Sequence, residues 1–257
     1  MATYLLKKSY QRKDLKNVNF KDLWNSNGIF TTMWVYNNPH KILFFNKHIR
    51  NLVKSLKDYS LYEPNIKKNI TRIIKLNLKK NIKYNHLMRV AVDKKLISIS
   101  LRKRIKPKKN FGLKLFNYKR NRPKYKNLKY KKIIKYLSKI DTSIYDFALC
   151  VNNKILESAT SNILFVKNNK IYSPINEFYK GITLRFFEKK IKRIIKKNIF
   201  INSLHAFDEI ILVGSGKGVV SINNIHSFNW KRKSSKIYRY LLKIYQEAVT
   251  NCPRYYS

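Results

Sequence analysis

The chain has 257 residues, and its 57 Lys and Arg against 13 Asp and Glu give a formal net charge of +44 at pH 7. Hydrophobic residues make up 44%, which suffices for a folded core. Cys150 and Cys252 are the only cysteines, so a disulfide framework and a zinc-binding cysteine cluster are excluded. No apolar run approaches the roughly 18 residues that a membrane helix needs. We therefore expect a cytoplasmic protein with no membrane partner.

The positive charge alone suggests nucleic-acid binding. The basic residues, however, are mainly lysines spread from Lys7 to Lys243 rather than one arginine-rich patch. This pattern is typical of compositional drift on solvated faces, and it predicts only salt-dependent, nonspecific affinity for polyanions. We expect no specific nucleic-acid partner. A basic nucleic-acid-binding protein on a degenerate enzyme scaffold stays open as an alternative, with 118–125 as its nearest basic and aromatic stretch.

In the first hundred residues, strand-like and helical patterns alternate. Apolar and β-branched runs predict strands over 28–36, 41–45, 87–92 and 96–101. Apolar residues three and four apart predict helices over 48–56 and 65–78. The basic segment 102–125 contains Pro107 and Pro123, and we interpret 111–125 as a linker between an N-terminal domain of 1–110 and a C-terminal domain of 126–257.

The second half repeats this mixture of strands and helices. Strands are predicted over 148–151, 163–166 and 209–213, and helices over 128–137, 184–194 and 237–249. The expected fold class is mixed α and β (α+β) in two domains.

The segment from Glu157 to Asn162, Glu-Ser-Ala-Thr-Ser-Asn, is a polar run between two apolar strands. Small and polar side chains of this kind contribute little to a hydrophobic core, and they are typical of a functional site. A carboxylate in an apolar setting needs a cation or hydrogen-bond donors, since otherwise its pKa rises and it becomes neutral. Downstream, Gly181-Ile182-Thr183 opens a predicted helix and Gly214-Ser215-Gly216 follows a predicted strand. Backbone N–H groups at such places bind phosphate.

These letters resemble the E-x-x-x-x-N…G-I-T signature of the fold-type-IV pyridoxal-phosphate enzymes. That family includes branched-chain aminotransferases, D-amino-acid transaminases and 4-amino-4-deoxychorismate lyases. The resemblance implies a two-domain architecture with the site between the domains, pyridoxal 5'-phosphate as cofactor, a small-molecule substrate and a homodimer. It also implies that Glu157 pairs with the pyridine nitrogen, while Gly181, Ile182, Thr183, Ser215 and Gly216 bind the cofactor.

The resemblance further implies a Schiff-base lysine upstream of Glu157. Lys126-Asn-Leu-Lys-Tyr130 is similar to the family text K-T-L-N-Y-L, which makes Lys126 the catalytic lysine and Tyr130 a cofactor neighbour. Lys129 is the rival. An amine that carries the cofactor as an imine also serves as general base and acid after the substrate displaces it.

One motif departs from the family pattern. The usual phosphate-binding arginine lies in H-x-x-R-L, whereas this chain reads His48-Ile-Arg50-Asn51-Leu52. A shift of one residue turns a helical side chain by about 100°. Three alternatives follow: Arg50 reaches the phosphate from a rotated helix, a lysine replaces it, or cofactor affinity is lower.

Three features favour the lyase among the family members. The start of the strand at Gly28, Gly-Ile-Phe-Thr-Thr, looks like the lyase text G-x-F-T-T, and Ser215 to Val219 looks like S-L-R-G-V. The chain also lacks the extra length of branched-chain enzymes. The implied reaction converts 4-amino-4-deoxychorismate into 4-aminobenzoate and pyruvate in folate biosynthesis, with Thr31 and Thr32 lining the substrate pocket. A class-IV amino-acid aminotransferase is the alternative.

Overall fold

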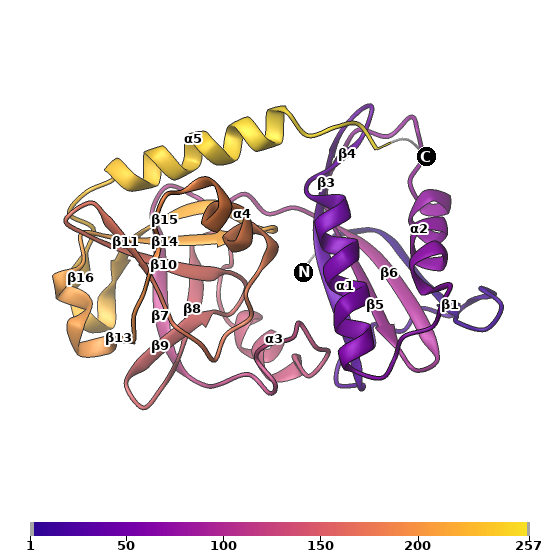
Figure 1. The fold of residues 1–257 in the computed structure, drawn as a ribbon, viewed down its shortest axis with the longest axis horizontal. Helices are drawn as coiled ribbons and strands as arrows, with labels where there is room; N and C mark the ends of the chain where they lie inside the picture. Colours follow the sequence, from indigo (N-terminus) through magenta and orange to yellow (C-terminus); the bar gives the residue numbers. More distant parts are fainter. Residues whose placement is uncertain (1–2, 256–257) are drawn as a thin grey trace. The chain divides into compact units, whose positions relative to one another are not determined.

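The computed structural model describes residues 3–255, which form two compact units (Figure 1). The N-terminal unit comprises 3–104, 125–131 and 251–255. The C-terminal unit comprises 105–124 and 132–250. Mixed α and β structure in both units confirms the expected fold class.

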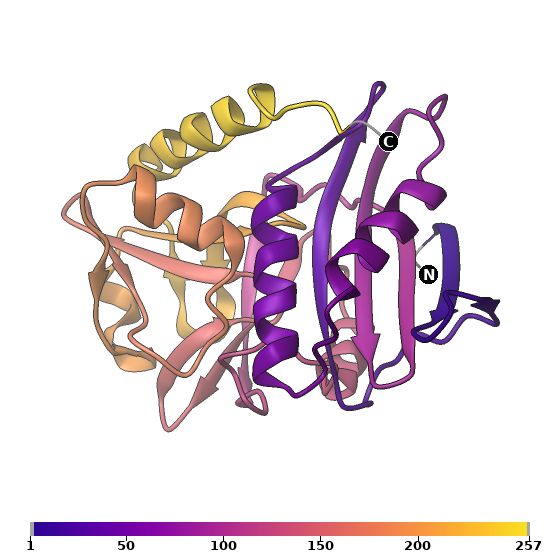
Figure 2. The ribbon, with the colours of Figure 1, turned by 45° about the vertical axis from the view of Figure 1, so that its right-hand side comes forward.

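A six-stranded antiparallel sheet forms the N-terminal unit, in the order β2-β1-β6-β5-β3-β4. Its strands are β1 (Tyr4–Gln11), β2 (Asn17–Val18), β3 (Gly28–Asn37), β4 (Lys41–Ile42), β5 (Tyr84–Asp93) and β6 (Leu96–Lys103). Helices α1 (Phe45–Asp58) and α2 (Ile66–Asn77) lie over one face of this sheet (Figure 2). The core of the unit lies between the helices and that face.

The alternation of β3 explains both faces of the sheet. Successive side chains of a strand point to opposite faces. Ile29, Met33 and Val35 are fully buried in the cluster that contains the apolar stripe of α1. Phe30 and Thr32 point to the second face, where the guanidinium of Arg89 stacks on the ring of Trp24 at 4.1 Å. The second face of the sheet is therefore polar and aromatic rather than aliphatic.

The chain returns to the N-terminal unit at 125–131. The Phe30 N–H donates to the carbonyl of Lys126 at 2.9 Å, and the Leu128 N–H donates to the carbonyl of Gly28 at 2.9 Å. The side chain of Leu128 is fully buried. These contacts attach the Lys126 backbone to the first residues of β3, so Lys126 belongs to the N-terminal unit.

The C-terminal unit contains a ten-stranded sheet. The main path runs β12-β11-β10-β14-β15-β7-β8-β9-β13, and β16 pairs with β15. The strands are β7 (Phe111–Asn117), β8 (Tyr145–Val151), β9 (Lys154–Ser158), β10 (Asn162–Lys167), β11 (Lys170–Ser173), β12 (Ile195–Lys196), β13 (Ile199–Phe200), β14 (Glu209–Gly214), β15 (Gly218–Ile225) and β16 (Trp230–Lys231). The helices of the unit are α3 (Lys131–Leu137), α4 (Ile182–Lys190) and α5 (Lys236–Thr250), with short 3-10 turns η1 (Ile201–Ala206) and η2 (His226–Phe228). Lys131, the first residue of α3, itself belongs to the N-terminal unit.

The predicted elements differ from the observed ones mainly at their ends. Phe45, expected in a strand, begins α1, and β4 is only two residues long. The segment expected as a linker, 111–125, contains β7, which pairs in parallel with β8 and with β15. Strand β1 has no clear alternation of apolar and polar residues, because Lys8 lies between Leu6 and Tyr10 on its core-facing side. Within 3–255 no helix is long and apolar enough to cross a membrane.

Gly28 tests the attachment of the 125–131 segment. A Cβ at this position would lie 2.4 Å from the carbonyl oxygen of Val92 and 2.6 Å from Cδ1 of Leu128. Overpacking of this kind costs about 1–3 kcal/mol. We expect Gly28→Ala to lower the free energy of unfolding by this amount in urea titrations. An unchanged value would contradict the close approach of both β5 and Leu128 to Gly28.

Candidate active site

The polar run after β9 forms a tight turn that Asp146 organises. Asp146 is fully buried on β8, and its carboxylate accepts hydrogen bonds from the Ser158 hydroxyl at 3.1 Å and from the Thr160 hydroxyl at 2.6 Å. The Ser158 hydroxyl also lies 3.0 Å from the carbonyl oxygen of Ser161, so its single proton is shared between these two acceptors. Ser158 and Thr160 fit this turn because both hydroxyls hydrogen-bond to the buried Asp146 carboxylate. The turn therefore fixes the position of Glu157, the preceding residue.

Glu157 forms a buried ion pair with Arg120. The guanidinium donates through Nε to Oε1 at 2.8 Å and through Nη2 to Oε2 at 2.6 Å. Both side chains are buried, with 8% of Arg120 and 4% of Glu157 exposed. The Tyr179 N–H adds a longer contact of 3.4 Å to Oε1. A bidentate guanidinium is the partner that a buried carboxylate requires to remain ionised.

Asn162 connects this turn to the start of α4. Its side-chain amide donates to the carbonyl of Tyr179 at 2.6 Å, and its Oδ1 accepts from the Gly181 N–H at 2.9 Å. Gly181 is the N-cap of α4, and a Cβ there would lie 2.8 Å from Oδ1 of Asn162. A side chain at this position would therefore displace the Asn162 amide from the Gly181 N–H.

The first turn of α4 offers donors for an anion. The opening N–H groups of a helix have no intrahelical acceptor, and the helix dipole favours negative charge there. The hydroxyl of Thr183, 1% exposed, is buried and has no hydrogen-bond partner among the described residues. A buried hydroxyl without a partner at a helix N-terminus is chemically suited to a phosphate group.

The turn between β14 and β15 lies next to these residues. Val213, at the end of β14, pairs with Asn162, and a Cβ at Gly214 would lie 2.7 Å from the Ser161 hydroxyl. Ser215 and Gly216 follow directly. The structure therefore brings together, at one end of the C-terminal sheet, Glu157, the start of α4 at 181–183, and Ser215 with Gly216.

In the N-terminal unit, Lys126 lies near Phe30 and His48. Its ammonium is 5.1 Å from the centroid of the Phe30 ring. The imidazole Nδ1 of His48 shares a hydrogen bond of 2.8 Å with the Thr31 hydroxyl. Burial, and secondly the positive charge of Lys126, lower the pKa of His48 to about 3. His48 is therefore neutral near pH 7.

The two candidate lysines differ in their surroundings. Lys126 is half-buried, whereas Lys129 is exposed and donates to the carbonyl of Asn25 at 2.6 Å. Tyr130 is buried, and its ring lies 5.7 Å from that of Phe30 and 5.8 Å from that of Trp24. An aromatic cluster thus borders the Lys126 segment, and the environment favours Lys126 over its rival.

Three other predicted site residues, Arg50, Thr31 and Thr32, do not share one location in the structure. Arg50 is exposed on α1, where its Nε donates to the carbonyl of Asn46 at 3.3 Å. Asn51 comes three residues after His48 and therefore lies on the same side of α1 as His48. Arg50 comes two residues after His48 and does not share that side, so its position on α1 does not support it as a phosphate ligand. Thr31 and Thr32 point to opposite faces of β3, so no single pocket on one face of the sheet contains both side chains.

Arg89 is a site candidate that the sequence analysis missed. An arginine inside the apolar strand 87–92 is unusual, and this could have indicated a functional residue. Arg89 pairs with Thr32 across β3 and β5, so both side chains point to the second face. Burial lowers its pKa to about 10, against the opposing effect of Asp22. Its Nη1 is buried without a hydrogen-bond partner among the described residues. A buried guanidinium with an unused N–H group is suited to a ligand carboxylate.

Comparison with known families places the chain. The model of the family amino-transferase class IV matches residues 28–225, and the chain belongs to this family. No curated protein sequence matches it.

Solved structures show the same fold at low sequence identity. A branched-chain aminotransferase from Thermoproteus uzoniensis with norvaline superposes with a TM-score of 0.77 at 16% identity, covering 93% of each chain. A hypothetical aminotransferase from Mycobacterium tuberculosis, in its PLP-bound form, gives 0.73 at 13% identity, covering 95% of this chain and 99% of that one. A "putative 4-amino-4-deoxychorismate lyase" from Legionella pneumophila gives 0.69 at 16%, covering 87% and 91%. The class-IV aminotransferase fold is thereby established.

The Arg120–Glu157 pair predicts a large cost when one partner is removed. Arg120→Met leaves a buried carboxylate without its cation, which costs about 3–5 kcal/mol. The double variant Arg120→Met/Glu157→Gln removes both charges, so we expect it to recover much of this loss in urea titrations. Lys119→Met, which removes the exposed Lys119–Glu177 pair, is the matched control and is expected to cost less than about 1 kcal/mol.

His48 predicts a pH dependence of stability. Its folded pKa of about 3 lies below the ordinary value of 6.5, so between these pH values the unfolded chain binds a proton that the folded chain does not. The contribution of neutral His48 to the free energy of unfolding is complete above pH 6.5. Below that pH it falls by up to about 1.4 kcal/mol per pH unit. Urea unfolding of His48→Asn is expected to lack this slope, while the exposed control His226→Asn keeps it. Equal slopes in all three proteins would exclude a buried neutral His48.

Proposed function

We propose that this protein is a pyridoxal-phosphate-dependent lyase that converts 4-amino-4-deoxychorismate into 4-aminobenzoate and pyruvate. The observation that carries the cofactor assignment is the buried Arg120–Glu157 pair close to the N-terminus of α4. An ionised carboxylate beside a helix N-terminus offers partners for the two ends of pyridoxal phosphate. The family match over residues 28–225 and the PLP-bound form of the Mycobacterium tuberculosis neighbour support this cofactor.

When bound, pyridoxal phosphate supplies a protonated pyridine ring that withdraws electrons from the reacting carbon of the substrate. Glu157 would keep the pyridine nitrogen protonated, because a carboxylate clamped by Arg120 stays negative. The N–H groups of Ile182 and Thr183, with the Thr183 hydroxyl, would bind the phosphate. Ser215 and Gly216 would add donors from the neighbouring turn.

Lys126 would carry the cofactor covalently and later move protons. After the substrate amine displaces it, its Nζ would accept the ring proton of the substrate while the enolpyruvyl C–O bond breaks and the ring becomes aromatic. The enolpyruvate released takes up a proton to give pyruvate. Neutral His48 adds no second positive charge near this amine, which a cationic imidazole would do.

The substrate carries carboxylates, and Arg89 is the strongest candidate to bind one of them. Its buried Nη1 without a hydrogen-bond partner and its position beside Thr32 support this role. The lyase is favoured over an aminotransferase by the text Gly-Ile-Phe-Thr-Thr at Gly28 and by the sequence 215–219. The aminotransferase remains the second candidate, because the Thermoproteus uzoniensis neighbour has that activity by name. We also propose a homodimer, as the family resemblance implies.

The covalent lysine is tested by spectroscopy. Purified protein mixed with pyridoxal phosphate is expected to show the absorption band of a lysine–cofactor linkage, and borohydride reduction should fix the label on the peptide that contains Lys126. The band should vanish in Lys126→Ala and persist in the matched control Lys129→Ala. Its survival in Lys126→Ala would move the linkage to another lysine, and no band in any of the three proteins would overturn the cofactor proposal.

The reaction is tested by assaying product release. We expect 4-aminobenzoate and pyruvate to form from 4-amino-4-deoxychorismate, with no amino-group transfer to a 2-oxo acid. Arg89→Leu should lower kcat/KM roughly 10- to 100-fold, because a hydrogen bond to a charged group contributes about 1.5–3 kcal/mol. Lys103→Leu, at an exposed position of β6, is the control. Transfer activity without 4-aminobenzoate release would establish the aminotransferase instead.

A further inference from the structure

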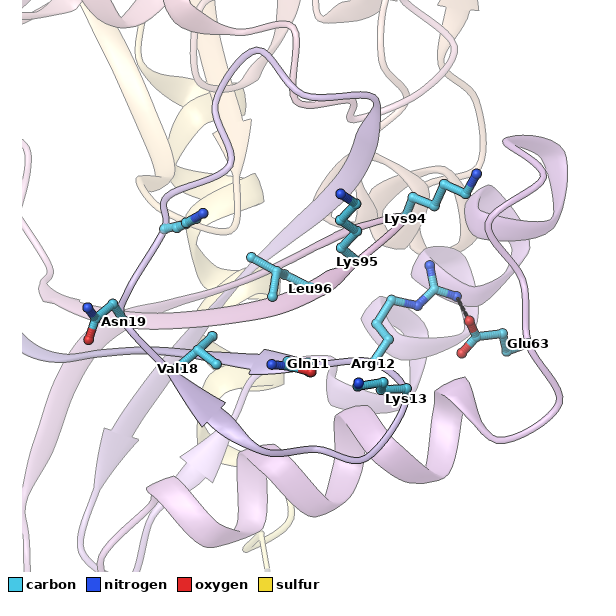
Figure 3. A pocket seen from close by; sticks show the side chains of 10 residues that line it. Gln11, Arg12, Lys13, Val18, Asn19, Glu63, Lys94, Lys95 and Leu96 are labelled. Carbon is cyan, nitrogen blue, oxygen red and sulfur yellow. Dashed lines mark ion pairs between the residues drawn. The ribbon is translucent and has the colours of Figure 1, made fainter.

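The N-terminal unit contains a pocket of about 910 Å³ at the turns that follow β1 and β5 (Figure 3). Its charged lining consists of Arg12, Lys13, Lys21, Lys94, Lys95 and Glu63. None of these residues belongs to the set assigned to the cofactor or to the substrate. The pocket therefore has no role in the proposed reaction.

Arg12 forms the fixed wall of this pocket. Its side chain is 5% exposed, and Nη2 lies 2.7 Å from a carboxylate oxygen of Glu63. The same guanidinium donates to the carbonyls of Leu61 and Asp93, each at 2.7 Å. These contacts connect the α1–α2 loop to the β5–β6 turn. The one acid of the pocket, Glu63, is thus already neutralised by Arg12.

The four lysines have no such compensation. Lys13, Lys21, Lys94 and Lys95 are exposed at the pocket, and within residues 3–255 no carboxylate lies at ion-pair distance from their ammonium groups. The nearby Asp93 carboxylate accepts the backbone N–H groups of Lys95 and Leu96 at 2.9 and 2.8 Å, so it stabilises the turn. Four like charges around one cavity repel one another, and a multiply charged anion would relieve that repulsion.

Apolar side chains lie among these charges. Leu96 on β6 and Val18 on β2 are half-buried and line the pocket, and both are labelled in Figure 3. Phosphate groups alone would leave these two side chains without a partner. An apolar or aromatic ring attached to the phosphates would cover them.

We propose that this pocket binds a small ligand that carries two or more phosphate groups on an aromatic body, of the class of nucleoside triphosphates. The phosphates contact the four lysines, and the aromatic body lies against Leu96 and Val18. This inference goes beyond the proposed lyase reaction and does not depend on it.

Calorimetric titration of the pyridoxal-phosphate-loaded protein with ATP, tripolyphosphate and adenosine tests the pocket. ATP is expected to bind at 150 mM salt, tripolyphosphate several-fold more weakly, and adenosine not at all. Lys94→Glu/Lys95→Glu should weaken ATP binding at least tenfold. The matched control is Lys67→Glu/Lys68→Glu on exposed positions of α2, which changes the net charge equally and should weaken binding less than twofold.

Each opposite result overturns part of the proposal. Equal weakening by the two double variants would show that ATP senses only the overall positive field. Equal affinity for tripolyphosphate and ATP would exclude the contact with Leu96 and Val18. A single-stranded oligonucleotide that binds more tightly than ATP, with the same loss in the Lys94/Lys95 variant, would replace the small ligand by a nucleic acid. The absorption spectrum of the bound cofactor is recorded for both double variants. If it is unchanged, a loss of ATP binding concerns this pocket and not the proposed lyase site.

Discussion

The buried position of Glu157 depends on the guanidinium of Arg120. A carboxylate with 4% of its side chain exposed would become neutral or destabilise the fold without a cation. Arg120 removes this conflict by two hydrogen bonds, and Glu157 in turn fixes the end of β9 at which the polar turn begins. Asn162 transmits that position to the Gly181 N–H and so to the start of α4. One ion pair therefore determines where a negative charge and a helix N-terminus lie relative to each other.

The same physical logic separates residues that carry charge for chemistry from residues that carry it for structure. Asp146 and Glu157 are both buried and both accept hydrogen bonds, but their donors differ: Asp146 accepts two side-chain hydroxyls and the Phe147 N–H, whereas Glu157 accepts a guanidinium. A carboxylate in that setting is a structural acceptor for its turn. Arg89 is the converse case, because a buried Nη1 of its guanidinium has no acceptor within the described residues. Unused hydrogen-bonding capacity at a buried charge points to a ligand.

Much of the fold could be predicted from periodicity, since β3, β5, β6, α1 and α2 follow patterns of two or 3.6 residues. Glu157 stood out because acids are rare in this chain. Arg120 did not stand out, because it lies among 57 basic residues, in a segment that resembles a solvated linker, and its partner is 37 positions away. Likewise, Lys126 and Lys129 differ in the sequence only by their fit to the family motif. In the structure they differ in surroundings, because Lys126 is half-buried near the Phe30 ring whereas Lys129 is exposed. Long-range pairing is the information that local patterns lack.

The fate of the acids also explains how the chain tolerates a charge of +44. Glu209 is 1% exposed, and its carboxylate accepts the N–H groups of Ile237 and Tyr238 at the start of α5. Glu188 bonds both Lys180 and Lys196; burial alone would raise its pKa, but these two cations lower it. These two acids therefore lie where a helix start or a pair of neighbouring lysines provides partners for a negative group. Exposed lysines outside such places cost little, because water and salt screen them. The net charge is thus a property of the solvated surface, and a basic region gains meaning only where, as around Lys94 and Lys95, several uncompensated lysines share one concave space.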